Sequence, residues 1–284
     1  MALIQGTALS EDLYGSSFRD SIFGYDGNDT IEANDGNDYL VGGRGNDTIY
    51  GEDGNDTLSG ESGSNSLMGG YGDDLYIIAS NSDSLYDYGG FDTVQSLLSS
   101  YTLPTNYYIK ELVLGAGAAY GYGNDYDNKL TGNNANNFLV GYSGEDTLIG
   151  NNGDDTLKGG DGDDNLSGGS GKDIIQGYED SYEIDTLAGG SGADKFILGS
   201  ASTTFYLNGN YSYAVVNDFS ATQGDKIQIN GPRGLYFLVK DEDVIGGPAK
   251  DTVVYIRESF GSNDYFAVFP DTTNVNLTRD FIVV

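Results

Sequence analysis

The 284-residue sequence contains neither cysteine nor histidine. Without cysteine the chain can form no disulfide framework and no thiolate metal site. Without histidine, zinc and other transition-metal sites lose their usual nitrogen ligand, and a Ser-His-Asp triad cannot be assembled. A Gly-x-Ser-x-Gly elbow and a phosphate-binding Walker sequence are also missing. We therefore expect a protein that is not an enzyme.

Basic residues are scarce as well, at 13 against 44 acidic residues, which gives a formal net charge of −31. Such a surface repels nucleic acids and anionic membranes, so neither is an expected partner. No apolar run is long enough to span a bilayer, and the N-terminal residues lack the basic and apolar regions of a secretory signal. High acidity is typical of disordered chains, but an apolar content of 38% with regularly spaced apolar residues argues against simple disorder. We therefore expect the chain to be disordered only in the absence of metal.

Glycine is abundant, with 44 residues, and it recurs every nine residues rather than every three as in collagen. Residues 141–176 read GYSGEDTLI, GNNGDDTLK, GGDGDDNLS and GGSGKDIIQ. Every block has Gly at positions one and four, Asp at position six, and Leu or Ile at position eight. A nine-residue period does not fit a helix. It predicts a tight turn, with positive φ at both glycines, followed by a short strand that buries only position eight.

The repeated aspartates indicate a metal. Two blocks form one coil of a flattened solenoid, so loops 18 residues apart stack on one edge and place Asp146 over Asp164 and Asp155 over Asp173. Stacked carboxylates repel each other unless a cation lies between them. Ca²⁺ accepts oxygen ligands in flexible geometry, whereas Mg²⁺ requires a stricter octahedron and fits worse. A simple turn preference of Asp explains its presence in the loop but not its constant position.

The same frame starts at Gly6 and runs through the first half of the chain. Its sixth positions pair at 18-residue spacing as Asp20/Asp38, Asp38/Asp56, Asp56/Asp74, Asp29/Asp47 and Asp47/Asn65. The last of these sites should be weaker, because Asn65 is neutral. After Gly177 the frame slips by three residues. We expect the Asp173/Asp194 pair still to bind calcium, whereas the sequence does not decide whether Asp164/Asp185 and Asp74/Asp92 bind it.

The middle of the chain, residues 78–122, has few glycines but keeps the phase, since Gly69 and Gly123 are six whole blocks apart. We expect one continuous solenoid whose middle coils keep their strands and lose calcium. Tyrosines cluster in and beside this segment, and aromatic faces there would suit a glycan or protein partner.

These blocks resemble the calcium-binding nonapeptide of the RTX (repeats-in-toxin, haemolysin-type) family. The resemblance implies an all-β fold, a right-handed parallel β-roll. It also implies a ligand rule. Each ion takes the carbonyls of positions two and four and the Asp of one loop, with the carbonyls of positions one and three and the Asp of the loop 18 residues further on.

Mapped onto this sequence, the ligand rule and the stacked loops imply two sets of metal-binding residues. In the first array they are Ser16, Phe18, Asp20, Tyr25, Gly27, Asp29, Ala33, Asn34, Asp35, Gly36, Asp38, Gly42, Gly43, Arg44, Gly45, Asp47, Gly51, Glu52, Asp53, Gly54, Asp56, Gly60, Ser62, Asn65, Gly69, Tyr71 and Asp74. In the second array they are Tyr142, Gly144, Asp146, Asn151, Gly153, Asp155, Gly159, Gly160, Asp161, Gly162, Asp164, Gly168, Gly169, Ser170, Gly171, Asp173, Gly189, Ser191 and Asp194.

We divide the chain into a first calcium-binding array (1–77), a calcium-poor spacer (78–122), a second array (123–198) and a C-terminal segment (199–284). Short β-branched and aromatic runs between turn signals predict an antiparallel β cap for the last segment, which would cover the exposed end of the roll. Its final residues, DFIVV, resemble the C-terminal signal read by type I export systems.

The sequence therefore predicts a secreted, monomeric protein in which several Ca²⁺ ions are structural and trigger folding after type I export. Two other roles stay open. One is a surface adhesin or matrix protein that binds glycans or cells, and the other is an export and stability module of a hydrolase. An ice-binding face is less favoured, because the outward threonines at position seven are interrupted by Tyr39, Ser66 and Asn165.

Overall fold

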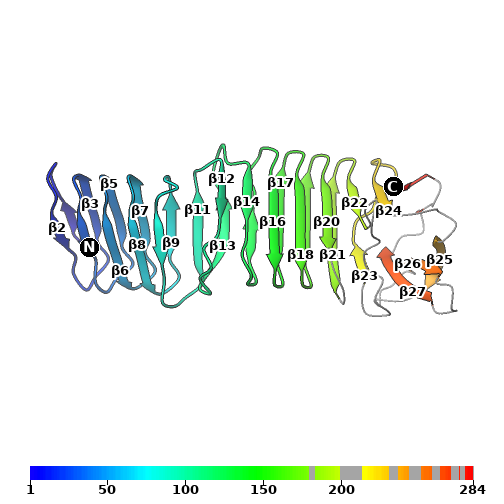
Figure 1. Ribbon diagram of the computed structural model, residues 1–284, viewed down its shortest axis with the longest axis horizontal. Helices are drawn as coiled ribbons and strands as arrows, with labels where there is room; N and C mark the ends of the chain where they lie inside the picture. The colour runs from blue at the N-terminus through cyan, green and yellow to red at the C-terminus, as the bar shows by residue number, and fades with distance from the viewer. Residues whose placement is uncertain are drawn as a thin grey trace. The chain divides into compact units, whose positions relative to one another are not determined.

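The structure is a computed structural model that describes residues 1–178, 183–198, 213–229, 236–242, 251–257, 263–269, 275 and 279–283. The chain divides into two compact units, Met1–Asn124 and Asp125–Val284 (Figure 1). Within the described ranges every regular element is a β-strand, and no helix long and apolar enough to cross a membrane occurs there. The prediction of an all-β, parallel solenoid is confirmed.

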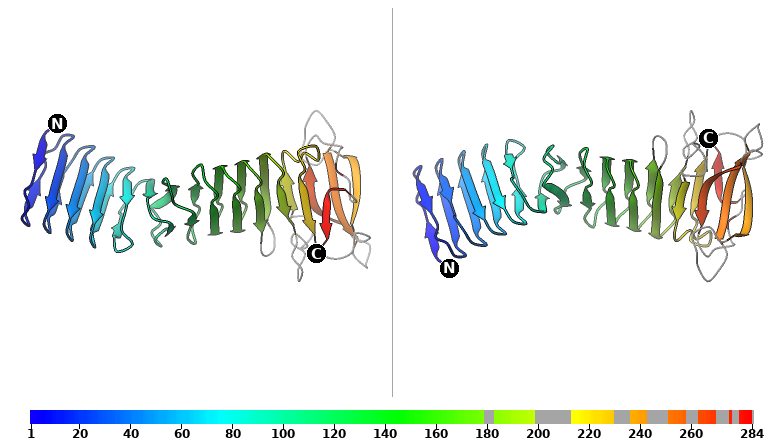
Figure 2. Two further views of the ribbon diagram at one scale, coloured as in Figure 1. Left: turned by 90° about the horizontal axis from the view of Figure 1, so that it is seen from above. Right: turned by 90° about the horizontal axis from the view of Figure 1, so that it is seen from below.

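The first unit places alternate strands on two sheets, and all the strand pairings described in it are parallel (Figures 1 and 2). One sheet contains, in order, β1 (Leu3–Gln5), β3 (Ser21–Asp26), β5 (Tyr39–Arg44), β7 (Thr57–Ser62), β9 (Leu75–Ile78), β11 (Asp92–Ser96) and β13 (Ile109–Leu114). The other contains β2 (Asp12–Tyr14), β4 (Thr30–Glu32), β6 (Thr48–Asp53), β8 (Ser66–Tyr71) and β10 (Ser84–Tyr86). Residues pair at 18-residue spacing, as in Ile22 with Leu40, so one coil contains two blocks.

Residues 78–122 keep their strands, but one of the two sheets is interrupted there. Strand β10 is the last of its sheet, and β12 (Ser100–Thr102) pairs with β14 (Tyr120–Tyr122) instead. On the opposite face β9, β11 and β13 pair without a break, although the register shifts after Asp92. The spacer therefore differs from the arrays in its sheet pairing as well as in its loops.

The second unit repeats the arrangement. Its first sheet contains β15 (Lys129–Thr131), β17 (Thr147–Asn152), β19 (Asn165–Ser170), β21 (Ile184–Ser191) and β23 (Tyr213–Val216). Its second sheet contains β16 (Phe138–Ser143), β18 (Thr156–Asp161), β20 (Ile174–Tyr178), β22 (Lys195–Ile197), β24 (Lys226–Ile229) and β28 (Phe281–Val283).

The expected antiparallel cap is not confirmed in that form. Strand β26 (Asp251–Arg257) pairs in antiparallel fashion with both β25 (Tyr236–Glu242) and β27 (Asn263–Phe269). However, β23 pairs in parallel with both β21 and β27, and β24 pairs in parallel with both β22 and β28. The parallel sheets thus continue past residue 198, because the short strands after it can still pair with the preceding coil. Most of the other residues between 199 and 284 lie outside the described ranges.

The core of each unit is a column of position-eight side chains between the two sheets. Leu40, Leu58, Leu148 and Leu157 are fully buried, while most of their neighbours at positions seven and nine are only partly buried. Burying one such side chain contributes about 1.5–3 kcal/mol. This column is what the nine-residue period predicted, and it holds the loops at both edges in a constant position.

Candidate calcium sites

In the glycine-rich blocks, the loop turns through two residues with positive φ, at positions two and four; the blocks that begin at Gly15 and Gly132 lack this feature. In the block of Asp29 these are Tyr25 (φ 75°) and Gly27 (φ 134°). The described glycines at position one, such as Gly24, do not adopt this conformation. The prediction of positive φ was therefore right for position four and wrong for position one, where glycine is required for another reason.

Position one needs glycine because two oxygens converge beside it. A methyl group on Gly51 would collide with Asp56 Oδ2 of the same block, and it would lie 2.6 Å from the carbonyl oxygen of Gly69 in the next coil. A methyl group on Gly150 would likewise collide with Asp155 Oδ2 and lie 2.5 Å from the carbonyl oxygen of Gly168. The glycine thus leaves open a space that is bordered by a carboxylate and a carbonyl oxygen.

The carbonyl oxygens of positions two and four point along the stack toward the next loop. A methyl group on Gly160 would collide with the carbonyl oxygen of Tyr142, and one on Gly162 would collide with that of Gly144. The same relation holds on the other edge between Asn151 and Gly169 and between Gly153 and Gly171. At position three, the side chains of Asp35, Asp53 and Asp161 are exposed, which leaves only their carbonyls near the loop.

The position-six residues form ladders in which each backbone N–H donates to Oδ1 of the corresponding residue in the next coil. The distance is 2.6 Å from Asp20 to Asp38 and 2.8 Å from Asp155 to Asp173. The remaining expected neighbours are also joined, over 2.7–2.9 Å: Asp38/Asp56, Asp56/Asp74, Asp29/Asp47, Asp47/Asn65, Asp74/Asp92, Asp146/Asp164, Asp164/Asp185 and Asp173/Asp194. Carboxylates that the sequence pairs are therefore adjacent in the structure, including those on either side of the three-residue slip.

The second carboxylate oxygen of most ladder residues has no hydrogen-bond partner. This holds for Oδ2 of Asp29, Asp38, Asp47, Asp56, Asp74, Asp92, Asp146, Asp155, Asp164, Asp173 and Asp194, all of them at most 3% exposed. A buried carboxylate oxygen without a partner is costly in a folded protein. Each loop therefore presents a negative oxygen, with carbonyls close by, to a space that a hard cation could fill. The donor set fits Ca²⁺, and the full ligand sets stay a prediction.

Comparison with known families decides what kind of repeat this is. A family model described as the RTX calcium-binding nonapeptide repeat (four copies) matches residues 5–40, 32–67, 50–77, 122–157, 140–175, 149–184, 158–196 and 181–202, which together cover more than half of the chain. The chain belongs to the RTX calcium-binding repeat family. No curated protein matches this RTX chain.

Two solved structures resemble the RTX chain. One is the solution structure of a subunit of a mannuronan C5-epimerase from Azotobacter vinelandii, with 22% identity and a TM-score of 0.33; the match covers 56% of this chain and 78% of that one. The other is the extracellular lipase LipA from Serratia marcescens, with 15% identity and a TM-score of 0.25; that match covers 98% of this chain and 39% of the lipase.

Burial changes the acidity of the RTX carboxylates. Mainly because they are removed from solvent, the pKa is raised to about 6 for Asp155, to about 7 for Asp56 and Asp146, and to about 9 for Asp164. Carboxylates of neighbouring coils raise the pKa of Asp164 further. Without a cation these groups hold protons near neutral pH, so calcium must compete with protons for them.

Asp20, in the first coil, differs from the other ladder residues. Its Oδ2 accepts hydrogen bonds from the Ser16 hydroxyl and backbone N–H at 2.7 and 2.8 Å, and its Oδ1 accepts one from the Ala2 N–H at 2.5 Å. The Ser16 hydroxyl is the main reason that the pKa of Asp20 is lowered. Both oxygens are thus satisfied by the protein, so Ser16 and Asp20 fit a cation less well than the later predicted sites do.

The structure adds ladder residues that the sequence analysis missed. Asp194 N–H donates to Asp225 Oδ1 at 3.0 Å, and the following strand β24 continues the sheet of β22. The signal was the triplet Asp225-Lys226-Ile227, which keeps the Asp-x-Ile order of positions six to eight, although positions one and four are Ser220 and Gln223 rather than glycine. Asp87, which lies beside Asp74 and Asp92, was also missed, because it occupies position one, where the motif has glycine.

Proposed function

We propose that this RTX chain is a secreted β-roll in which calcium is structural and triggers folding outside the cell, after export of the unfolded chain by a type I secretion system. The supporting observation is the series of buried carboxylate oxygens without partners at equivalent positions of stacked loops. Absence of catalytic motifs supports a non-enzymatic role.

The mechanism is linkage between metal binding and folding. In the Asp155 site, the Asp155 and Asp173 carboxylates and the carbonyls of Asn151, Gly153, Gly168 and Ser170 would hold one ion. Its positive charge would balance the negative charge of the buried carboxylates. In the unfolded chain these groups are far apart, so the cation binds the stacked form and stabilises it. Extracellular calcium modules bind at about 10⁻⁴–10⁻³ M, so the chain would stay unfolded at cytosolic calcium levels.

The test is a calcium titration of metal-free protein, followed by circular dichroism and by size-exclusion chromatography. We expect little β-signal without metal, a cooperative gain at about 0.1–1 mM calcium, and reversal by a chelator. The variant Asp56→Asn should weaken the response, whereas Asp53→Asn, at an exposed position of the same block, should not. A metal-free chain that is already folded and unchanged by calcium would contradict the proposal.

A second role, binding of a glycan or cell-surface partner, is favoured by one surface of the first unit. Phe23, Tyr25 and Tyr39 border a hollow of about 360 Å³ together with Arg44 and Glu61, and the Phe23 ring lies 6.4 Å from Tyr25 and 5.9 Å from Tyr39. Aromatic faces beside polar groups suit sugar rings. A glycan array probed with calcium and with chelator tests this role, and binding should fall in Tyr39→Ala. Activity in a co-purified hydrolase would instead favour an accessory export module.

A further inference from the structure

One column of position-one residues contains an exception. Along the edge that carries Asp56, Asp74 and Asp92, position one is Gly51, then Gly69, then Asp87, each 18 residues apart. At position one, glycine normally leaves the cation space open because it has no side chain. In the third of these blocks, Asp87 brings a carboxylate into that space.

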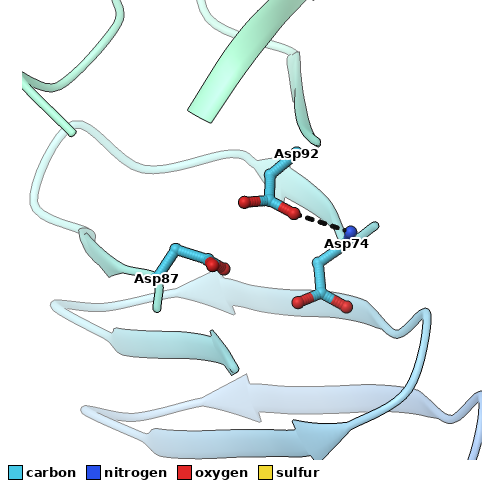
Figure 3. Close-up of side chains that lie close together, drawn as sticks. All are labelled: Asp74, Asp87 and Asp92. Atoms are coloured by element: carbon cyan, nitrogen blue, oxygen red, sulfur yellow. Dashed lines mark hydrogen bonds between the residues drawn. The ribbon is translucent and has the colours of Figure 1, made fainter. Parts of the chain in front are cut away.

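Asp87 lies beside two ladder carboxylates, as Figure 3 shows. Asp74 precedes β9, Asp87 follows β10 and Asp92 begins β11, and one ligand atom from each lies within 4.8 Å of the other two. All three side chains are buried, at 2%, 7% and 0% exposure. Asp74 N–H donates to Asp92 Oδ1 at 2.9 Å, which leaves Oδ2 of both Asp74 and Asp92 without a partner.

The oxygens beside Gly69 differ from those in an ordinary loop. Beside Gly51 the two oxygens are Asp56 Oδ2 and the Gly69 carbonyl. Beside Gly69 they are Asp74 Oδ2, Asp87 Oδ2 and the Tyr76 hydroxyl. A second carboxylate therefore lies beside Gly69, where the equivalent space beside Gly51 is bordered by one carboxylate and one carbonyl.

A second departure from the repeat accompanies the first. Position eight, which is Leu or Ile in most other coils, is Tyr76 here, and its side chain is fully buried. The Tyr76 hydroxyl accepts from Gly69 N–H at 2.8 Å and donates to Asp87 Oδ2, with the Tyr86 carbonyl 2.9 Å away as an alternative acceptor. Burial raises the pKa of Tyr76 well above its usual range, so the hydroxyl keeps its proton. The backbone N–H of Gly89 donates a hydrogen bond to Asp87 Oδ1 at 3.0 Å.

We propose that Asp74, Asp87 and Asp92 form a three-carboxylate cation site that binds Ca²⁺ more tightly than the two-carboxylate loops and is filled first. This rests on the proposed calcium-binding function and adds a ligand from outside the nonapeptide pattern. Affinity of oxygen-ligand sites rises with the number of charged ligands. A trivalent lanthanide, which shares the preference of Ca²⁺ for hard oxygens, should gain more from the third carboxylate than Ca²⁺ does.

The first test is a calcium titration of the full chain against a chromophoric chelator, comparing wild type with Asp87→Asn and Asp87→Gly. Asparagine keeps an oxygen acceptor for Tyr76, and glycine restores the residue of the neighbouring coils. Both variants should weaken the tightest step about tenfold or more and leave the later steps within about twofold. Asp12→Asn, at an exposed strand position outside both sets of predicted metal-binding residues, is the control.

The outcomes separate the two proposals. If the wild type binds no calcium, the proposed function fails. If it binds in several steps and Asp87→Asn leaves the tightest step unchanged, the three-carboxylate site fails alone and Asp87 is only a hydrogen-bond acceptor for Tyr76.

A second measurement does not depend on an Asp87 variant. Tyr76 lies against the site, so its ring should sensitise luminescence of Tb³⁺ bound there. At one equivalent of Tb³⁺, Tyr76→Phe should lose more than half of the emission, whereas Tyr14→Phe, at an exposed position, should lose little. Equal emission from Tyr76→Phe and wild type at one equivalent would overturn the assignment of this site as the first to fill.

Discussion

At the scale of single residues, glycines that look equivalent in the sequence have different structural roles in the repeat. Gly27 and Gly144, at position four, adopt positive φ, whereas Gly51 and Gly150, at position one, leave room for oxygens. The first kind resists substitution because of its backbone conformation, and the second because of the space beside it. The two kinds should therefore respond differently to calcium.

The variant Gly150→Ala tests the space beside position one. Its methyl group would displace Asp155 Oδ2 and approach the Gly168 carbonyl, so we expect the loss of one ion and a calcium-bound form less stable by about 1–3 kcal/mol. Urea unfolding in saturating calcium measures the stability, and competition with a chromophoric chelator counts the ions. The control is Gly117→Ala, which has open space but φ of +90°, so it should keep every ion and lose less stability. Loss of an ion in both variants, or in neither, would contradict the assignment.

The buried carboxylates also predict how pH affects the metal-free fold. The pKa is about 7 for Asp146 and Asp173 and about 9 for Asp164, against 3.8 for an ordinary Asp, so the folded form holds these protons more tightly than the unfolded form. The resulting stability is present in full below about pH 4 and is lost as pH rises through 7 to 9, at up to about 1.4 kcal/mol per pH unit and group.

Metal-free protein, which should show little β-signal at pH 8, should thus gain β-signal at pH 5. In saturating calcium the stability should change in the opposite sense, because calcium binds the deprotonated carboxylates and protons displace it. The measurements are circular dichroism of the metal-free protein and the urea midpoint of the calcium-bound protein, each at both pH values. A metal-free β-signal that rises from pH 5 to pH 8 would show that the aspartates are not buried as described.

At the scale of elements, the strand is defined by its central side chain. Leu157 in β18 is fully buried between Leu139 and Ile175, its partners in β16 and β20. The flanking Thr156 and Lys158 are partly exposed. Packing of the column, rather than the intrinsic preference of a three-residue strand, therefore holds each coil to the next.

We expect Leu157→Ala to destabilise the calcium-bound protein by about 2–5 kcal/mol, through lost burial and the cavity that remains. Thermal unfolding in saturating calcium measures the loss. The control is Asn165→Ala, at an exposed position seven, which should stay within about 0.5 kcal/mol of wild type. Similar losses from both variants would mean that the column is not the main contact between coils.

The nine-residue period predicted these elements because one constraint, a buried position eight, sets strand, loop and stacking together. It could not show that Gly51 is required because a side chain there would collide with two oxygens, since the period shows only that glycine recurs. It also missed Asp225, whose loop lacks glycine at positions one and four, and Asp87, whose position the motif assigns to glycine. The parallel pairing of β24 with β28 joins residues far apart in sequence, which local alternation cannot reveal.

At the scale of the whole chain, charge and folding are coupled. A net charge of −31 opposes compaction, and a large share of the acidic residues lies in loops where cations would neutralise them. The division into two arrays, a calcium-poor spacer and a C-terminal segment stays a prediction.

The aspartate ladders also have a direction. In each coil the backbone of one aspartate donates to the carboxylate of the coil that follows it, never the reverse, in the pairs described above. A carboxylate is therefore oriented by the coil on its N-terminal side. When a coil stacks after a folded coil, the backbone N–H of the folded coil orients the acidic ligand of the new coil. When a coil stacks before a folded coil, its own acidic ligand has no such donor. Ordering of the roll should accordingly be easier from the N-terminal end of each unit toward its C-terminal end than in the opposite sense.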